Sequence, residues 1–195
     1  MAEKSGIAWT QATWNPWMGC EHLSPGCDHC YMFREMRRYG KWDPEFVRRT
    51  KTTFNNPVKW KEPKLIFTCS WSDWFIKAAD QWREEAYEII RKANQHTYQI
   101  LTKRHGRIIK NLPHDWPLNN VWLGVTGENH EWFWKRAKQL AKVPAVPVRY
   151  ISAEPLIGEI NVTADELRQL GVDWLIAGGE SGSNCRPMEL DWARK

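Results

Sequence analysis

Short apolar runs alternate with longer amphipathic segments along most of this chain. The runs are about five residues long, are rich in branched and aromatic side chains and end in polar residues, which is typical of strands buried in a parallel sheet. Such runs lie at residues 65–69, 98–102, 121–125, 149–153 and 174–178. A further strand is expected ahead of them at residues 7–9.

The segments between these runs carry signals for helix starts and ends. Asp80 and Asn129 are placed to cap two amphipathic helices. Thr163 and Glu166 form a capping box that opens another helix, and Gly171 is placed to end it. A short helix is also expected over residues 108–112. Strands and helices that alternate in this way predict an α/β fold with a parallel sheet and helices outside.

Length and connectivity limit the architecture further. A chain of 195 residues without internal repeats is expected to form a single domain over residues 1–195. Residues 42–64 are polar, contain three prolines and are expected as a long excursion. Right-handed crossovers can lay six βα units out as an open sheet or curl them into a partial barrel, and hydrophobic periodicity does not distinguish the two.

A cysteine loop at residues 14–31 carries the most informative chemistry. Cys20, Cys27 and Cys30 are spaced C-x6-C-x2-C, and a Ser-Pro-Gly turn can bring the first thiolate back to the other two. A helix capped by Asp28 is expected to follow. Thiolates at a helix N-terminus favour a soft metal or an iron–sulfur cluster, because backbone N–H groups and the helix dipole stabilise their negative charge.

Three cysteines are fewer than a closed structural metal site needs, because zinc and iron–sulfur sites of that kind take four protein ligands. The open position could take an exogenous group, such as the amino and carboxylate groups of S-adenosylmethionine on a four-iron cluster. Two alternatives stay open. One is a zinc site with His22 or His29 as the fourth ligand, and the other is three unliganded thiols. The ligand count favours iron–sulfur over zinc.

Polar and charged side chains follow every predicted strand from residue 65 onward. Because the carboxyl ends of parallel strands meet at one edge of the sheet, we expect these side chains to form one polar mouth that faces a ligand. The glycine-rich turn at residues 178–182 allows backbone N–H groups to approach a ligand closely. The candidate binding residues are Ser70, Ser72, Asp73, Lys103, Glu128, Ser152, Glu154, Gly178, Gly179, Glu180, Ser181 and Arg186.

Some of these candidates suit particular chemical groups. Lys103 and Arg186 suit a carboxylate or a phosphate, whereas Asp73 and Glu154 suit ribose hydroxyls or an ammonium group. Cys185 follows the glycine turn and is a further candidate, as a fourth ligand or as a hydrogen-atom donor. Taken singly, each of these residues could instead be a cap or a turn former.

The composition of the chain also indicates which class of partner the protein could bind. The chain carries a formal net charge of +5 and 14 tryptophans, several of them next to lysine or arginine. Aromatic rings interleaved with cations suit nucleic acid, because rings stack on bases while cations neutralise phosphates. The alternative is that the tryptophans belong to the core. The sequence has no long apolar run and no signal-peptide pattern, so a soluble, cytoplasmic chain without a membrane partner is expected.

Motifs in a fixed order resemble the phage and prophage three-Cys-motif family of uncharacterised, radical-SAM-like proteins. The resemblance covers nearly the whole chain. The motifs are WNPWxGC from residue 14, SPGCxxCY from residue 24, LTKR from residue 101, SAEPL from residue 152 and GGESG from residue 178.

This resemblance implies a partial (β/α)6 barrel of the radical SAM type that holds a 4Fe-4S cluster on Cys20, Cys27 and Cys30. It implies reductive cleavage of S-adenosylmethionine to a 5′-deoxyadenosyl radical, with an external electron donor, and it places Tyr31 near the adenine. Charge and aromatic content add a nucleic acid or nucleotide as the substrate of a modification or repair reaction. Relatives are often encoded beside a second protein, which implies a neighbouring-gene partner.

The chain also departs from the radical SAM pattern. The commonest spacing is C-x3-C-x2-C, whereas six residues separate Cys20 from Cys27 here. The motif that usually binds the methionine amino group follows the second strand, whereas Gly178, Gly179 and Glu180 follow the sixth predicted strand. Relatives usually continue past this point with another helix and strand, so a shorter and more open barrel is expected.

Two other functions stay open beside the enzyme. One is a metal-stabilised nucleic-acid-binding module without catalysis, which predicts salt-dependent binding and no turnover of S-adenosylmethionine. The other is a subunit that is inactive without its partner protein.

Overall fold

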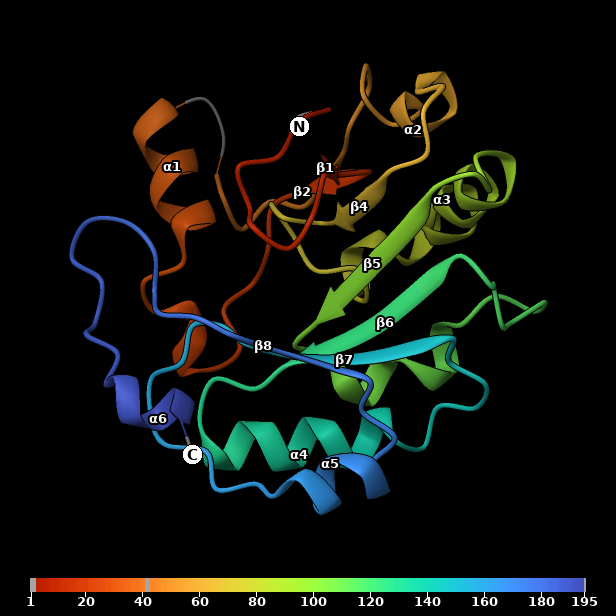
Figure 1. The fold of residues 1–195 in the computed structure, drawn as a ribbon. Helices are drawn as coiled ribbons and strands as arrows, with labels where there is room; N and C mark the ends of the chain where they lie inside the picture. The colour runs from red at the N-terminus through yellow and green to blue at the C-terminus, as the bar shows by residue number, and fades with distance from the viewer. Residues whose placement is uncertain (1–2, 41–42, 195) are drawn as a thin grey trace.

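The computed structural model describes residues 3–40 and 43–194, so that residues 1–2, 41–42 and 195 of the predicted domain lie outside the described part. Its framework is a sheet of parallel strands in the order β1-β4-β5-β6-β7-β8, flanked by helices (Figure 1). The predicted α/β fold with a parallel sheet is confirmed. The strands are β1 (Ala12–Trp14), β4 (Leu65–Thr68), β5 (Thr97–Thr102), β6 (Val121–Thr126), β7 (Val148–Ala153) and β8 (Trp174–Ala177).

Helices α3 (Asp80–Lys92) and α4 (His130–Leu140) cover one face of this sheet. Their apolar sides share a core with Ile100, Leu123 and Ile151 of β5, β6 and β7. Side chains alternate between the two faces along a strand, so the neighbours of these residues point to the opposite, inner face. That inner face is available to line a cavity.

The predicted starts of two helices are confirmed. The Asn129 side chain accepts a hydrogen bond from the Trp132 amide at 3.0 Å, which caps α4. Helix α5 (Ala164–Gln169) begins at the predicted capping box, in which Thr163 and Glu166 each accept the other's backbone N–H. Figure 1 shows α4 and α5 next to each other below β6, β7 and β8.

The chain between β1 and β4 forms a second, two-stranded sheet, of which only β3 lies in the predicted excursion. Strand β2 (Trp17–Met18) pairs antiparallel with β3 (Arg48–Arg49), and the short helix α2 (Asn56–Lys59) follows. Strands of two residues leave no readable hydrophobic alternation, so the sequence predicted the excursion without its elements.

Helix α1 (Tyr31–Tyr39) follows the cysteine loop. Its N-cap is Cys30, and the predicted cap at Asp28 is wrong. The reason is that the 3-10 turn η1 (Pro25–Cys27) comes first, and Asp28 ends that turn. The helix ends at Gly40, whose φ of 62° lies in the left-handed region that favours glycine.

The first strand lies later in the chain than predicted. Residues 7–9 form a bend and a turn ahead of β1. Trp9, whose apolar side chain suggested a strand, packs against Phe67 of β4 and Trp174 of β8, with ring centroids 4.7 and 6.2 Å away. Because Trp9 precedes one edge strand and contacts the other, the sheet is curved across its inner face.

Other short elements also differ from the prediction. In place of one helix over residues 108–112, the chain forms two 3-10 turns, η3 (His105–Arg107) and η4 (Ile109–Asn111). The 3-10 turn η2 (Lys77–Ala79) precedes α3, so that Asp80 is the first helical residue and not the cap. Helix α6 (Leu190–Arg194) was not predicted.

Several tryptophans belong to the core. Trp14, Trp17 and Trp74 are wholly buried, and Trp60, which precedes a lysine, is 8% exposed. For these residues the core alternative is correct, and they are not available for stacking on a nucleic acid.

Candidate functional site

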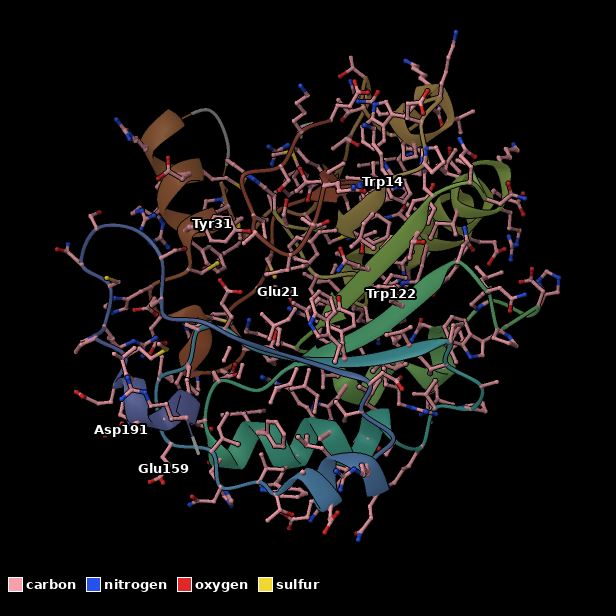
Figure 2. The ribbon with its side chains drawn as sticks, in the orientation of Figure 1. Trp14, Glu21, Tyr31, Trp122, Glu159 and Asp191 are labelled. Atoms are coloured by element: carbon pink, nitrogen blue, oxygen red, sulfur yellow. The ribbon has the colours of Figure 1, made fainter. Side chains whose placement is uncertain are left out.

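The inner face of the sheet lines a cavity of about 810 Å³. Its walls come from the cysteine loop and from the carboxyl ends of the parallel strands, and its volume is typical of small-molecule sites, which hold roughly 300–1,000 Å³. Figure 2 shows Tyr31, one of the residues that line the cavity, at the foot of α1. The predicted site residues that line it are Cys20, Cys27, Cys30, Tyr31, Ser70, Ser72, Asp73, Lys103, Ser152, Glu154, Gly178, Gly179, Glu180 and Ser181.

The three clustered cysteines reach the cavity from three short elements. Cys20 follows β2, Cys27 ends η1, and Cys30 caps α1. Backbone hydrogen bonds shape the loop between them: the Cys27 amide donates to the Ser24 carbonyl at 2.8 Å, and the Cys30 amide donates to the Cys27 carbonyl at 3.2 Å. None of the five cysteines, all within the described residues, forms a disulfide.

Cys20 lies beside the charged groups of Arg104 and Asp73. Burial raises the pKa of Cys20 to about 12, and the nearby Arg104 guanidinium opposes this effect. Arg104 Nη1 lies 3.7 Å from Cys20 Sγ and 3.4 Å from Asp73 Oδ2. A cation is therefore already in place beside the first thiol of the loop.

The donors that this loop presents to the cavity are thiols, the type of ligand that soft metals and iron–sulfur clusters take. Three free thiols face one cavity, and the charge of Cys27 is felt by Cys20. Within the described residues, no three histidine, cysteine, aspartate or glutamate side chains are gathered closely enough to hold a metal ion.

Asp73 is a hydrogen-bonding centre of the cavity wall. Its Oδ1 accepts from the Thr102 hydroxyl at 2.7 Å and from the Phe75 amide at 2.9 Å. Its Oδ2 accepts from the Lys103 amide at 2.8 Å. The carboxylate thus ties the loop after β4 to the end of β5, and most of its hydrogen-bonding capacity is used within the protein.

Asn15 was missed by the sequence analysis as a site-forming residue. Its side-chain Oδ1 accepts from the Trp71 amide at 2.8 Å, and its Nδ2 donates to Ser70 Oγ at 3.0 Å. The Tyr31 hydroxyl donates to the Ser70 carbonyl, and Ser72 Oγ donates to the Gly19 carbonyl at 2.5 Å. The WNPW motif therefore positions the loop after β4 against the cysteine loop.

Glu154 and the glycine turn face each other. A Cβ added at Gly178 would lie 3.2 Å from the Glu154 carboxyl carbon, so a larger residue here would press on the carboxylate. Glu154 Oε2 accepts from the Trp9 indole Nε1 at 3.2 Å. Trp9 and the rest of residues 5–9 line the cavity, which the strand prediction for residues 7–9 did not indicate.

Glu180 and Arg186 form a pair beside the cavity. Arg186 Nη2 lies 2.6 Å from Glu180 Oε1, and the Arg186 amide donates to Oε2 at 2.8 Å. Burial acts to raise the pKa of Glu180, but hydrogen bonds from Arg186 outweigh burial and hold the pKa below its usual value. Arg186 itself does not line the cavity. His29, another residue that sequence reasoning did not assign to this pair, lies 3.4 Å from Glu180 Oε2.

Glu128 lies outside the cavity, contrary to its predicted role as a ligand contact. Its side chain is wholly buried and pairs with the wholly buried Arg136 of α4. Cys185 is exposed and also lies outside the cavity wall. Cys69, the last residue of the predicted strand at residues 65–69, is buried and lines the cavity.

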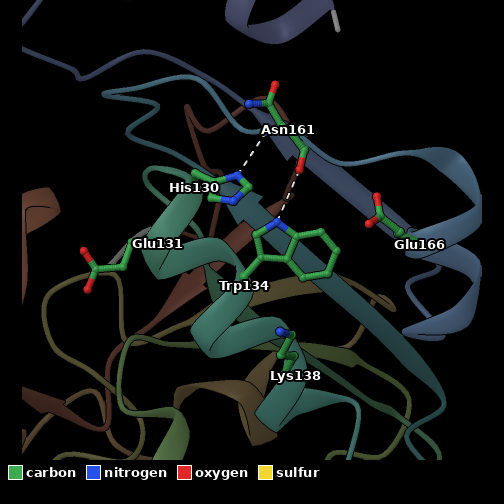
Figure 3. A pocket seen from close by; sticks show the side chains of 6 residues that line it. All are labelled: His130, Glu131, Trp134, Lys138, Asn161 and Glu166. Carbon is green, nitrogen blue, oxygen red and sulfur yellow. Dashed lines mark hydrogen bonds between the residues drawn. The ribbon is translucent and has the colours of Figure 1, made fainter.

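A second depression lies on the outer helical layer, away from the cysteine loop (Figure 3). The Trp134 indole donates to the Asn161 carbonyl at 3.2 Å, and the His130 ring accepts from the Asn161 amide at 3.3 Å. These contacts hold the chain after β7 against α4, which is a structural role.

The fold and site define an α/β protein whose curved parallel sheet and cysteine loop enclose a polar, cysteine-lined cavity. Within that class, the chain belongs to the family described as protein of unknown function (DUF5131), whose model matches residues 4–195. No curated protein and no solved structure matches it. In the described part of the chain, no helix has the length and apolar character needed to cross a membrane.

Proposed function

We propose that this chain is a radical SAM-like iron–sulfur enzyme. Cys20, Cys27 and Cys30 ligate a 4Fe-4S cluster, and the cavity holds S-adenosylmethionine at the open iron. The observation that carries the proposal is that three free thiols of one loop face the same cavity as the strand ends. When bound, the cluster supplies the electron for reductive cleavage of S-adenosylmethionine to a 5′-deoxyadenosyl radical.

In this proposal the sheet is a partial (β/α)6 barrel of the radical SAM type. The contacts of Trp9 with Phe67 and Trp174 support it, because they join opposite sides of the sheet across its inner face. The resemblance to the phage and prophage three-Cys-motif family supports the same arrangement.

The chain's own residues bind and orient the cofactor in distinct ways. Gly178 and Gly179 allow the backbone to approach it closely. Glu154 lies opposite this turn and suits an ammonium or a ribose hydroxyl. Lys103 lines the cavity and suits a carboxylate or a phosphate. Tyr31, directly after the last cysteine, lies near the adenine.

The substrate in this proposal is a nucleic acid or a nucleotide. Arg37 and Arg38 are exposed near the end of α1, and the half-buried Trp71 lines the cavity. The chain therefore offers cations for phosphates at the end of α1 and a ring for bases at the cavity wall. An external electron donor and a neighbouring-gene partner protein complete the reaction system.

The deciding experiment measures iron and sulfide in anaerobically purified protein, with the visible spectrum before and after addition of S-adenosylmethionine. About four irons per chain are expected. Iron should be lost in C20A, C27A and C30A and kept in the control variant C185A. Reductant should then convert S-adenosylmethionine to methionine and 5′-deoxyadenosine together.

The outcomes separate the proposal from its alternatives. Zinc in place of iron, with no spectral response, would end the radical mechanism and favour a metal-stabilised nucleic-acid-binding module. Turnover that requires addition of the neighbouring-gene protein would identify the chain as a partner-dependent subunit.

A further inference from the structure

Two arginine–glutamate pairs of the described residues hold the turn between Cys20 and Cys27. The inner pair is Arg136 of α4 and Glu128 after β6, whose side chains are both wholly buried. Arg136 Nη2 donates to Ser24 Oγ at 2.9 Å. Glu128 Oε1 accepts from the Gly26 amide at 3.4 Å. The pair thus contacts both sides of Pro25.

The outer pair is Arg186 and Glu180, which contacts the same turn from the glycine-turn side. Arg186 Nη2 donates to the Pro25 carbonyl at 2.8 Å, and Nη1 lies 3.4 Å from Asp28 Oδ2. The turn is therefore held from the protein interior by α4 and from the surface by the segment after β8.

The inner pair is itself anchored to the cavity wall. Arg136 donates to the Thr126 carbonyl at 2.8 Å and to the Lys103 carbonyl at 3.1 Å, at the ends of β6 and β5. A Cβ added at Gly26 would lie 3.1 Å from the Glu128 side chain, so the turn lies directly on the carboxylate. One side chain thus joins two strand ends to the loop that carries the cysteines.

Burying an ion pair is costly in free energy, and a well-packed apolar pair at the same place is often as stable or more stable. Stability alone therefore does not account for a wholly buried arginine and glutamate. The pair also fixes the position of one turn, because Arg136 and Glu128 each form a hydrogen bond with it. Cys27 is the next residue after Gly26, and its amide donates to the Ser24 carbonyl.

We propose that Arg136 and Glu128 are positioning residues that hold Cys27 at the cavity. The six-residue gap between the first two cysteines contains the turn that this pair holds. The part of this inference that concerns metal uptake rests on the proposed function, whereas the part that concerns the position of the Cys27 thiol does not.

The first test uses metal-free protein and needs no cofactor. The variants are R136K and the milder S24A, which removes one acceptor of Arg136 and leaves the buried charges in place. The control is R83K, since Arg83 of α3 is 4% exposed and donates to the Trp74 and Ile76 carbonyls ahead of η2, away from the turn between Cys20 and Cys27. The readouts are hydrogen exchange of the Gly26 amide and the alkylation rate of Cys27, which is 8% exposed.

Both rates should rise by about tenfold or more in R136K and S24A, because local opening of the turn exposes the thiol and the amide. The R83K variant should keep the wild-type rates. If R136K does not fold, S24A decides the matter. Wild-type rates in folded S24A and R136K would overturn the proposal.

The second test measures iron uptake during anaerobic reconstitution. Iron affinity should fall about 10- to 100-fold in R136K and S24A, as is usual when a residue that orients a metal ligand is changed. Unchanged affinity would overturn the positioning role toward the metal. A wild-type protein that takes up no iron would refute the proposed function instead, and the alkylation rates would still decide whether the pair positions Cys27.

Discussion

The indole Nε1 of Trp9 donates a hydrogen bond to Glu154 Oε2 over 3.2 Å, although 145 residues separate the two in the sequence. Trp9 lies just ahead of the edge strand β1, and Glu154 follows β7, the neighbour of the other edge strand. The bond therefore spans the inner face of the sheet and restrains the Glu154 carboxylate at the cavity wall.

Replacing Trp9 by Phe should lower the free energy of unfolding by about 1 kcal/mol, because the ring contacts are largely kept while the hydrogen bond is removed. Trp9→Ala should cost about 3 kcal/mol, since it also removes the contacts with Phe67 and Trp174. Urea unfolding measures both values. Glu154→Gln keeps an acceptor oxygen and is the matched control. Equal stability of W9F and wild type would show that the bond contributes nothing.

The buried carboxylate of Glu128 should make stability depend on pH. Burial acts to raise its pKa, but the charges of Arg136 and Lys103 outweigh burial, so the folded-state pKa lies below the usual value. A lowered pKa means that the stabilisation is fully present above the unfolded-state pKa, about 4.3, and is lost as the pH falls from there through the folded-state pKa.

Urea unfolding of wild type and Glu128→Gln at a series of pH values tests this dependence. Wild type should lose stability more steeply than the variant as the pH falls from about 5 to 3. The variant should be less stable than wild type at neutral pH, because it leaves the Arg136 charge buried without its partner. Parallel curves for the two proteins would contradict the assignment.

The thiols should react in an order set by burial. Burial raises the pKa of Cys69 well above its usual value, and this side chain is 3% exposed, whereas Cys185 is exposed. Ellman's reagent at pH 8 should therefore show one fast thiol, and Cys185→Ser should remove that phase. Cys69→Ser should leave it unchanged. A fast phase that persists in C185S would place another thiol at the surface.

Binding of single-stranded nucleic acid should depend on the exposed end of α1. Arg37→Glu should weaken binding, and it should reduce the slope of log K against log salt concentration by about one for each phosphate that the variant no longer neutralises. The control is Arg168→Glu, which makes the same charge change on α5, where Arg168 pairs with Asp165. Fluorescence anisotropy at several salt concentrations compares them. Equal weakening by both variants would point to net charge alone.

The strands of the parallel sheet were largely predictable, because runs such as residues 98–102 and 121–125 are apolar over most of their length. The first strand was not. Trp9 belongs to an apolar triplet, yet β1 begins at Ala12, because the indole packs across the inner face where only the curved sheet offers it neighbours. Hydrophobic periodicity describes one helix or strand at a time, so it carries no information about contacts between residues that are far apart in the sequence.

The site residues that a short sequence motif or a strand end marks could be predicted from the sequence. The residues whose role depends on a buried ion pair could not. The cysteines could be identified by their spacing. The strand-end residues could be identified because parallel strands end at one edge of the sheet. Arg136 follows Trp134 and Lys135, one of the places where a tryptophan lies next to cations, a pattern that suits nucleic acid, yet its side chain is wholly buried. Its partners Glu128 and Ser24 lie on other elements, so no local pattern could reveal the pair.

The strand order also bears on how the protein folds during synthesis. From β4 to β8, every strand pairs with the one that follows it in the sequence. The sheet can therefore grow as the chain leaves the ribosome, each new strand docking on an edge already formed. The contact between Trp9 and Trp174 must wait for the last strand. Until then the inner face is open to water, and the cysteine loop has an incomplete cavity beside it.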